Sequence, residues 1–272
     1  MKGGTSMLLA VNVGNKNVSF AVFESGCGDI AAKFSVSADK NRTADEYVIL
    51  VKQLLDYSGI DKEKLDGAVM ASVVPQLNDA IKSVIQKLIN KNPLVVGPGV
   101  KTGFAIRIDD PAELGADIVA NAVAVVAIMR SETADAPAII LDMGSVTTLF
   151  AINKNREVVG GAIIPGVDMS LDALHRETAQ LPNIELSSAA RAIGKNTKAS
   201  LTSGVILGQA AMIDGLIDRF EKELKCTAGE AIVFATGDKC EAVTNNCTHA
   251  FRYFPDLTLC GLAHIYKNTV EI

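Results

Sequence analysis

Two short glycine turns, each lying between a pair of apolar segments, constrain the fold of this chain more than any other feature. The first turn lies in "LLAVNVGNKNVSFAVF", residues 8–23, and the second lies in "IILDMGSVTTLFAI", residues 139–152. When the two segments are superposed their glycines coincide, whereas Asn12 falls on Asp142. Apolar segments joined by a small polar turn with glycine predict β-hairpins. Two related hairpins in one chain indicate a duplicated domain.

The segments that follow each hairpin have the same order. "TADEYVILVKQLLDYSG" opens with Thr43 and Glu46 in capping-box spacing and predicts a helix. We expect further strands at 29–38, 65–74, 93–97, 158–166 and 230–237, and further helices at 76–92, 113–130, 168–179, 200–224 and 255–268. The pattern predicts two α/β domains, residues 1–134 and 135–272, with packing of the last helix against the first half left open.

Composition narrows the class of partner. The chain has 272 residues, 49% of them hydrophobic, and a net charge of −5, so no basic footprint for nucleic acid or an anionic membrane is present. We expect a small-molecule partner. Five cysteines without CxxC spacing, and no leader or membrane-spanning run, favour a cytoplasmic protein with reduced thiols. Cys247 and His249 are interpreted as neighbours in a loop rather than a zinc pair.

The glycine turns also predict chemistry. A strand that ends in a small or acidic residue, followed by Gly and then Asn, Ser or Thr, exposes backbone N–H groups in a concave turn that can hold phosphate. A carboxylate before such a turn can hold a cation against the phosphate oxygens. One such turn alone is more simply a hairpin with a glycine in it. Two copies in matching halves favour a nucleotide held between them.

Several longer motifs make the chain resemble the superfamily of actin, the heat-shock chaperone ATPases and the sugar and acetate kinases, and within it the type III pantothenate kinases. The resemblance covers nearly the whole chain. Its motifs are "NVGNKN" (12–17), "VGPGVKTG" (96–103), "DDPAELGAD" (109–117), "DMGSVTT" (142–148), "GGAIIPGVDMSLDALHRETAQLP" (160–182), "IGKNT" (193–197) and "PDLTLCGL" (255–262).

This resemblance implies two duplicated actin-like (ribonuclease H-like) domains with a cleft between them, and transfer of the ATP γ-phosphoryl group to pantothenate, the first step towards coenzyme A. It implies Mg²⁺ and a monovalent cation, K⁺ or NH₄⁺, as cofactors, with Asp142 at the monovalent cation. It implies Asp117 as the proton acceptor and a homodimer in which Thr197 completes the neighbouring active site. The implied ATP-binding residues are Asn12, Val13, Gly14, Asn15, Lys16, Asn17, Val18, Ser19 and Ser145, and the implied pantothenate-binding residues are Ile108, Gly115, Ala116, Asp117, Ile118 and Thr197.

Two of these residues also have simpler interpretations. Asp117 lies at the start of the apolar helix "ELGADIVANAVAVVAIMR", where the helix dipole favours an ionised carboxylate of low pKa. Taken alone, it is a first-turn or N-cap acid. Thr197 alone could cap the helix expected to start near Ser200.

The chain departs from the family pattern at several site positions. Asn12 stands where the family has an aspartate, Lys16 replaces a threonine, Ile108 a tyrosine and Ile118 an arginine, and "ATGDK" lacks a second glycine after Gly237. One hypothesis is a kinase that binds phosphate through Lys16. The alternative is a catalytically impaired paralogue with a ligand-binding or regulatory role. An acetate or sugar kinase is disfavoured, because "GPGVKTG" and "IGKNT" are both present.

Overall fold

The chain forms two α/β units. The computed structural model describes residues 6–24, 28–186 and 191–270. Unit 1 comprises Met1–Ala105, Asp109–Glu132 and Asp256–Ile272, and unit 2 comprises Ile106–Ile108 and Thr133–Pro255. The closing helix therefore belongs to unit 1, and a three-residue segment before the "GAD" motif belongs to unit 2.

Unit 1 contains a five-stranded sheet in the order β3-β2-β1-β4-β5. β1, β2 and β3 are successively antiparallel, whereas β4 runs parallel to β1 and β5 parallel to β4. The strands are β1 (Met7–Val13), β2 (Asn17–Glu24), β3 (Ile30–Ser37), β4 (Leu65–Ser72) and β5 (Leu94–Val95). The helices are α1 (Ala44–Tyr57), α2 (Asn78–Ile89), α3 (Ala116–Ser131) and α7 (Leu257–Val270), with short 3₁₀ helices at Lys62–Lys64, Pro75–Leu77 and Pro111–Glu113.

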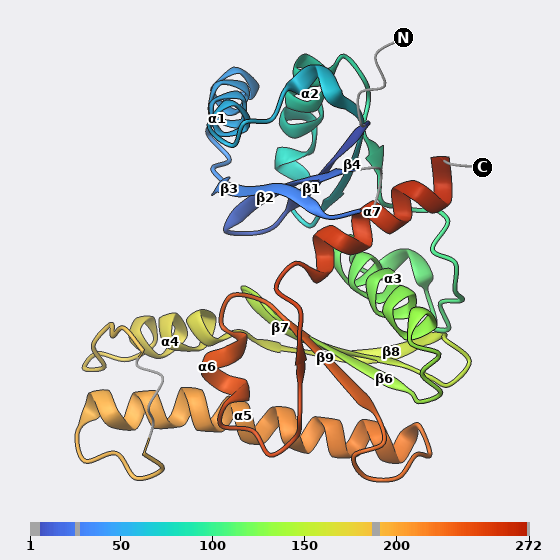
Figure 1. Cartoon of the computed structure of the whole chain (residues 1–272). Coiled ribbons are helices and arrows are strands. Elements are labelled where there is room, and N and C mark those ends of the chain that lie inside the picture. The colour runs from blue at the N-terminus through green and yellow to red at the C-terminus, as the bar shows by residue number, and fades with distance from the viewer. Residues whose placement is uncertain (1–5, 25–27, 187–190, 271–272) are drawn as a thin grey trace. The chain divides into compact units, whose positions relative to one another are not determined.

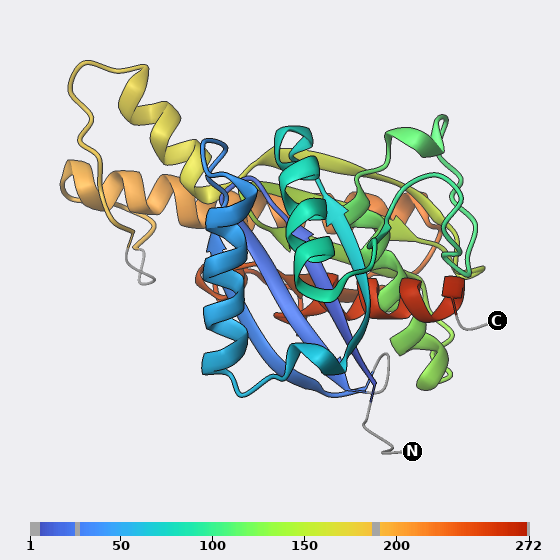
Figure 2. The same ribbon diagram turned by 90° about the horizontal axis from the view of Figure 1, so that it is seen from above.

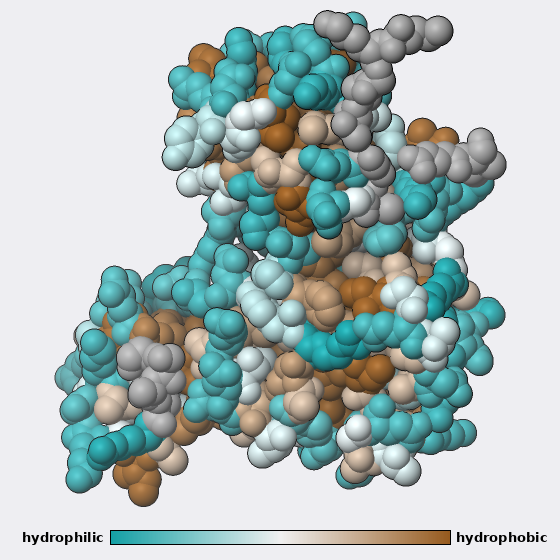
Figure 3. Space-filling view, in the orientation of Figure 1, coloured by the Kyte–Doolittle hydropathy of each residue, from teal (hydrophilic) through white to brown (hydrophobic). Residues whose placement is uncertain are grey.

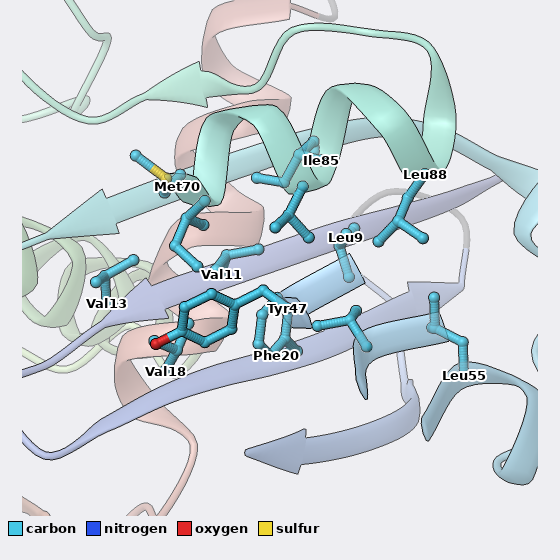
Figure 4. Packing of buried hydrophobic residues seen from close by; sticks show 14 of the residues in the cluster. Leu9, Val11, Val13, Val18, Phe20, Tyr47, Leu55, Met70, Ile85 and Leu88 are labelled. Carbon is cyan, nitrogen blue, oxygen red and sulfur yellow. The ribbon is translucent and has the colours of Figure 1, made fainter. Parts of the chain in front are cut away.

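Helices α1 and α2 cover one face of this sheet (Figures 1 and 2), and Figure 4 shows buried residues of the core on this face from close by. Leu9, Val11 and Val13 of β1 point to this face and pack with Phe20, Tyr47, Leu55, Met70, Ile85 and Leu88. α1 begins as predicted: the Thr43 side chain accepts from the Glu46 N–H, and Glu46 accepts from the Thr43 N–H. The outer faces of α1 and α2 are mainly hydrophilic (Figure 3), as expected for amphipathic helices over a sheet.

Helices α3 and α7 cover the opposite face of the same sheet (Figures 1 and 2). Gly261 of α7 lies so close to α3 that a Cβ on it would overlap the Ala120 carbonyl group. Near the other end of α7, the Tyr266 hydroxyl lies over Gly67 of β4. Small residues at these two points let α7 approach both α3 and the sheet.

Unit 2 repeats the strand order of unit 1. Its sheet has the order β10-β9-β6-β7-β8, with the hairpin β6–β7 at the centre, β8 antiparallel to β7, and β9 and β10 parallel to β6. The elements are β6 (Ala138–Met143), β7 (Val146–Ile152), β8 (Val158–Pro165), α4 (Val167–Arg176), α5 (Thr197–Glu223), β9 (Ile232–Thr236), α6 (Cys240–Thr244) and β10 (Arg252–Tyr253).

The core of unit 2 lies between its sheet and α5. Ile139, Leu141 and Met143 of β6 pack with Ile206, Ile213 and other buried residues of α5. By length and composition alone α5 is apolar enough to cross a membrane, but its apolar face is used in this core.

Most expected elements are present, with differences at their ends. α5 begins at Thr197 rather than near Ser200, and β5 is confined to Leu94–Val95. α6 and β10 were not predicted, because each is too short to show a period.

Candidate active site

The first glycine turn is a tight and accessible loop. Val13 pairs with Val18, and the Gly14 N–H donates to the Asn17 carbonyl over 2.9 Å. Asn15, Lys16 and Asn17 are exposed at its tip. A Cβ on Gly14 would lie 3.2 Å from the Asn17 carbonyl oxygen, so a larger residue would strain the turn. The loop has the compact, exposed backbone expected of a phosphate cradle.

Asn12 places an unsatisfied acceptor at the end of β1. Its Oδ1 atom is buried and receives no hydrogen bond from the described residues. It is paired in the sheet with Ser19 and Ala71. Leaving a buried acceptor without a partner costs about 1–3 kcal/mol. A donor or cation supplied by a ligand would remove that cost, so the residue fits a role in binding.

Asp117 is a half-buried carboxyl group in the first turn of α3. Gly115 is the N-cap residue, and the Asp117 Oδ1 atom accepts from the Ile118 N–H at 2.9 Å. Burial raises the pKa of Asp117 above its ordinary value, although the backbone hydrogen bonds act in the opposite direction. The expectation of a low pKa from the helix dipole was therefore wrong, because removal of the carboxylate from water outweighs the favourable helix terminus. Of the two simpler interpretations, the first-turn acid describes its position, and the N-cap does not.

The contacts of α7 show at which end of the sheet the start of α3 lies. Tyr266 lies over Gly67, near the start of β4, so α7 runs from the ends of the parallel strands back towards their starts. At the beginning of α7, the Thr258 hydroxyl donates to Asn121 Oδ1 at 2.7 Å. Asn121 lies one turn after Asp117 on α3. Asp117 therefore lies towards the carboxyl ends of β1 and β4.

Asn12 belongs to the same edge and the same face of the sheet. Leu9, Val11 and Val13 point towards α1 and α2, so the alternate residue Asn12 points to the face that α3 and α7 cover. Unit 1 thus brings the Asn12 loop and Asp117 to the carboxyl end of its parallel strands, which is where open α/β sheets bind ligands.

The second glycine turn lies among other glycine turns within unit 2. Asp142 lies two residues before Gly144 of this turn and pairs with Thr148 and Thr236. A Cβ on Gly166, at the start of α4, would overlap the Ser145 carbonyl oxygen. Gly237 after β9 has φ +103°, and a Cβ there would lie 2.5 Å from the Met143 backbone. Three chain turns therefore meet at the carboxyl end of β6 with their backbones in close contact.

Titratable side chains near the second glycine turn lie close to one another. Burial, together with the charge of Asp142, raises the pKa of the Cys240 thiol to about 11. Lys239 of the β9–α6 turn lies 3.7 Å from Asp168 at the start of α4. This ion pair joins the β9–α6 turn to the start of α4.

Two further predicted residues, Ile108 and Thr197, lie in unit 2. Thr197 is exposed and is the first residue of α5, but the cap is Asn196, whose side chain accepts from the Ala199 N–H at 2.9 Å. The interpretation of Thr197 as a cap was therefore wrong by one residue. Ile108 is half-buried, next to Arg107, whose N–H donates to the Val158 carbonyl over 2.7 Å.

Sequence reasoning missed the support behind Asp117. Asn121 is almost fully buried and is held by Thr258 from the last helix. An asparagine within an otherwise apolar helix was the available signal, since a buried amide needs a partner.

Two sheets with one shared strand order, each opening on a glycine hairpin, define a protein of the actin-like ATPase fold. Among solved structures, MreB 5 of Spiroplasma citri bound to AMPPNP aligns with a TM-score of 0.53 and 13% identity, over 98% of both chains. The family model for type III pantothenate kinase matches residues 8–219. The chain is 40% identical to the type III pantothenate kinase of Moorella thermoacetica over 96% of this chain and 99% of that protein. It is 38% identical to the corresponding protein of Exiguobacterium sp. over 96% and 98%. The chain belongs to the type III pantothenate kinase family.

Proposed function

We propose that this protein transfers the γ-phosphoryl group of ATP to the primary hydroxyl group of pantothenate, the first step of coenzyme A synthesis. The observation that carries the proposal is the half-buried Asp117 carboxyl at the same sheet edge as the Asn12 loop, in a chain of this family.

In the proposed reaction, the pantothenate hydroxyl oxygen bonds to the γ-phosphorus as the bond to the β-phosphate oxygen breaks. The hydroxyl proton passes to Asp117, and ADP leaves. A base whose pKa is raised accepts this proton more readily than an ordinary aspartate, provided that it is still ionised at the working pH. Because the transition state is loose, most of the catalysis comes from positioning and charge stabilisation.

The two loops have separate parts in this proposal. Asn12, Val13, Gly14, Asn15, Lys16, Asn17, Val18 and Ser19 would hold ATP phosphates from unit 1, and Ser145 would contact ATP from unit 2. Gly115, Ala116, Ile118 and Ile108 would line the pantothenate site. These assignments follow the family motifs in the sequence.

Metal ions would supply the remaining positive charge. Mg²⁺, when bound, neutralises charge on the phosphates; the unsatisfied Asn12 Oδ1 fits a cation ligand, although an amide is weaker than a carboxylate for Mg²⁺. Lys16, exposed at the loop tip, compensates by adding charge. Asp142 would hold the monovalent cation. We further propose a cytoplasmic homodimer.

The direct test is turnover of pantothenate and ATP by the purified protein, coupled to ADP detection. Asp117→Asn should lower kcat by about 10²–10⁴-fold, the usual contribution of a positioned base. Asp79→Asn is the matched control, since Asp79 is an exposed acid in the first turn of α2, and its rate should equal that of the parent. Equal rates for both variants would refute the role of Asp117.

A second variant separates an active enzyme from an impaired paralogue. Asn12→Asp combined with Ile118→Arg restores the family residues on both sides of the site. If the natural site is merely slow, the double variant should raise the rate. No turnover by either protein, with ATP still bound, would instead support the paralogue.

A variant of Thr197 can test whether the active site is shared between two subunits. If it acts in the partner's site, a mixed dimer of Asp117→Asn and Thr197→Ala chains should have one intact site and recover activity that neither parent variant has. A monomer in light scattering, or no recovery on mixing, would overturn the homodimer proposal.

A further inference from the structure

A cluster of acidic residues and one histidine lies in unit 2, outside the proposed kinase site. Asp214, Asp218 and Glu221 are spaced i, i+4 and i+7 on α5, which places them on one face of the helix. Like charges at this spacing destabilise a helix. A positive group over this face would reverse the effect. Within the described part of the chain, His249 is the basic residue in ion pairs with this face.

Both ring nitrogens of His249 contact carboxylate oxygens of the cluster. Its Nδ1 atom lies 2.8 Å from Asp214 Oδ1, and its Nε2 atom lies 3.2 Å from Asp218 Oδ1. Asp214 also accepts hydrogen bonds from the backbone N–H groups of Thr248 and His249, at 2.8 Å and 3.3 Å. The imidazole ring is therefore held rigidly, with Nε2 directed at a carboxylate.

This arrangement needs a cation at Nε2. A neutral imidazole has one N–H group, and here the closer partner, Asp214, fixes it on Nδ1. The Nε2 lone pair would then face a carboxylate oxygen, which is repulsive. Either a proton or a metal ion at Nε2 makes the contact attractive.

Glu221 favours the metal ion over the proton. Its carboxylate is buried, with a relative exposure of 2%, and is oriented by the N–H groups of Gly229 and Ala231 at 3.0 Å and 3.1 Å. One ligand atom from each of Asp218, Glu221 and His249 lies within 4.8 Å of the others. A single proton on His249 balances one of the three carboxylates, whereas a divalent ion balances two.

We propose that Asp218, Glu221 and His249 bind one divalent transition-metal ion, with Zn²⁺ as the best match. One imidazole nitrogen and two carboxylate oxygens suit Zn²⁺. Asp214 is the outer carboxylate that orients a metal-binding histidine through its other nitrogen. The exposed Asp218 leaves an open side where water completes the coordination. The ion would join the loop after α6 to α5.

Cys247 is not part of this site. Its thiol lies 3.6 Å and 3.7 Å from the carbonyl oxygens of Val243 and Ala210, and the set of ligand atoms within 4.8 Å of one another consists of those of Asp218, Glu221 and His249.

The test uses the full chain, stripped with EDTA, without nucleotide or Mg²⁺, and titrated with ZnCl₂ in a calorimeter. We expect one ion per chain and a rise in the melting temperature. Co²⁺ should give visible absorption bands that Zn²⁺ abolishes. Asp214→Asn should weaken binding by about 10–100-fold, as removal of such outer partners does.

Asp218→Asn carries the decisive comparison, since this exposed residue can change without loss of folding. It should weaken Zn²⁺ binding at least as much as Asp214→Asn. Glu223→Gln is the matched control, because it removes the same charge from an exposed position on α5, and it should bind as the parent does. Absence of saturable binding, or equal binding by Asp218→Asn and Glu223→Gln, would overturn the proposal. NMR of the His249 ring gives a further check. A ring that carries protons on both nitrogens and is unchanged by Zn²⁺ would also overturn the proposal, and would identify a proton as the cation between His249 and Asp218.

Discussion

Two opposing effects act on the pKa of Asp117. The start of α3 favours its ionised form, while burial favours its protonated form and prevails. A carboxyl group in such a balance is tuned for accepting a proton. The same balance makes it a source of instability whenever it is charged.

The pH dependence of the proposed reaction should report this group. Because the pKa of Asp117 is raised, the acid limb of kcat/KM should lie above the pH range of an ordinary aspartate. The folded protein then binds this proton more tightly than the unfolded chain. Ionised Asp117 therefore lowers the free energy of unfolding at neutral pH, and this effect disappears as the pH falls through the folded pKa.

Thermal melts of Asp117→Asn check the sign of this effect on stability. The variant should melt at a higher temperature than the parent at neutral pH, and the gap should close in acid. A gap that widens in acid would mean that the carboxylate is stabilised by its surroundings. At this scale the motif predicts Asp117 as the base, but the direction of its pKa shift could not be predicted, because burial of the carboxyl group is a property of the folded chain.

Helix α7 supports the candidate site through its packing against α3. Its close contact with α3 depends on Gly261, and the Thr258–Asn121 hydrogen bond sits beside the turn that carries Asp117. The sequence predicted α7 as a helix from its apolar period. Its neighbours were not predictable in the same way, because a period reveals which face is buried and not against what.

Gly261→Ala tests this packing. The added methyl group would overlap the Ala120 backbone, and overpacking of a core costs about 1–3 kcal/mol. Urea denaturation should reveal that loss, with a fall in kcat as α3 shifts. Gly204→Ala is the control: it also lies within a helix, but a Cβ there has open space. That change should be neutral or stabilise by up to about 1 kcal/mol. Equal effects of the two substitutions would contradict the contact between α3 and α7.

At the scale of the whole molecule, the duplication was the most predictable property. Both halves open on a hairpin, and the two sheets have the same strand order. The exchange of segments between units was harder to predict, since Ile106–Ile108 and Asp256–Ile272 lie away from their sequence neighbours. The metal cluster was also missed, because its ligands come from one helix face and a loop that no local spacing connects.

Nucleotide binding should be visible as stabilisation of the whole fold. A ligand present at about 100 times its Kd raises the free energy of unfolding by about 2.7 kcal/mol. ATP should therefore raise the melting temperature even without Mg²⁺, because Lys16 supplies positive charge at the loop. Lys16→Ala should reduce this rise, and Lys52→Ala, an exposed lysine on α1, should not. If both variants respond to ATP as the parent does, Lys16 has no part in phosphate binding.

The membership of α7 in unit 1 has a consequence for biosynthesis. The ribosome makes the sheet of this unit before it makes unit 2, and it makes α7, which packs on one face of that sheet, after unit 2. Until α7 has emerged, the sheet face that it packs against and the side of α3 that it contacts lack this cover. The first unit to emerge must therefore be the second to mature, and nascent chains that stall before residue 256 should be the ones that chaperones retain.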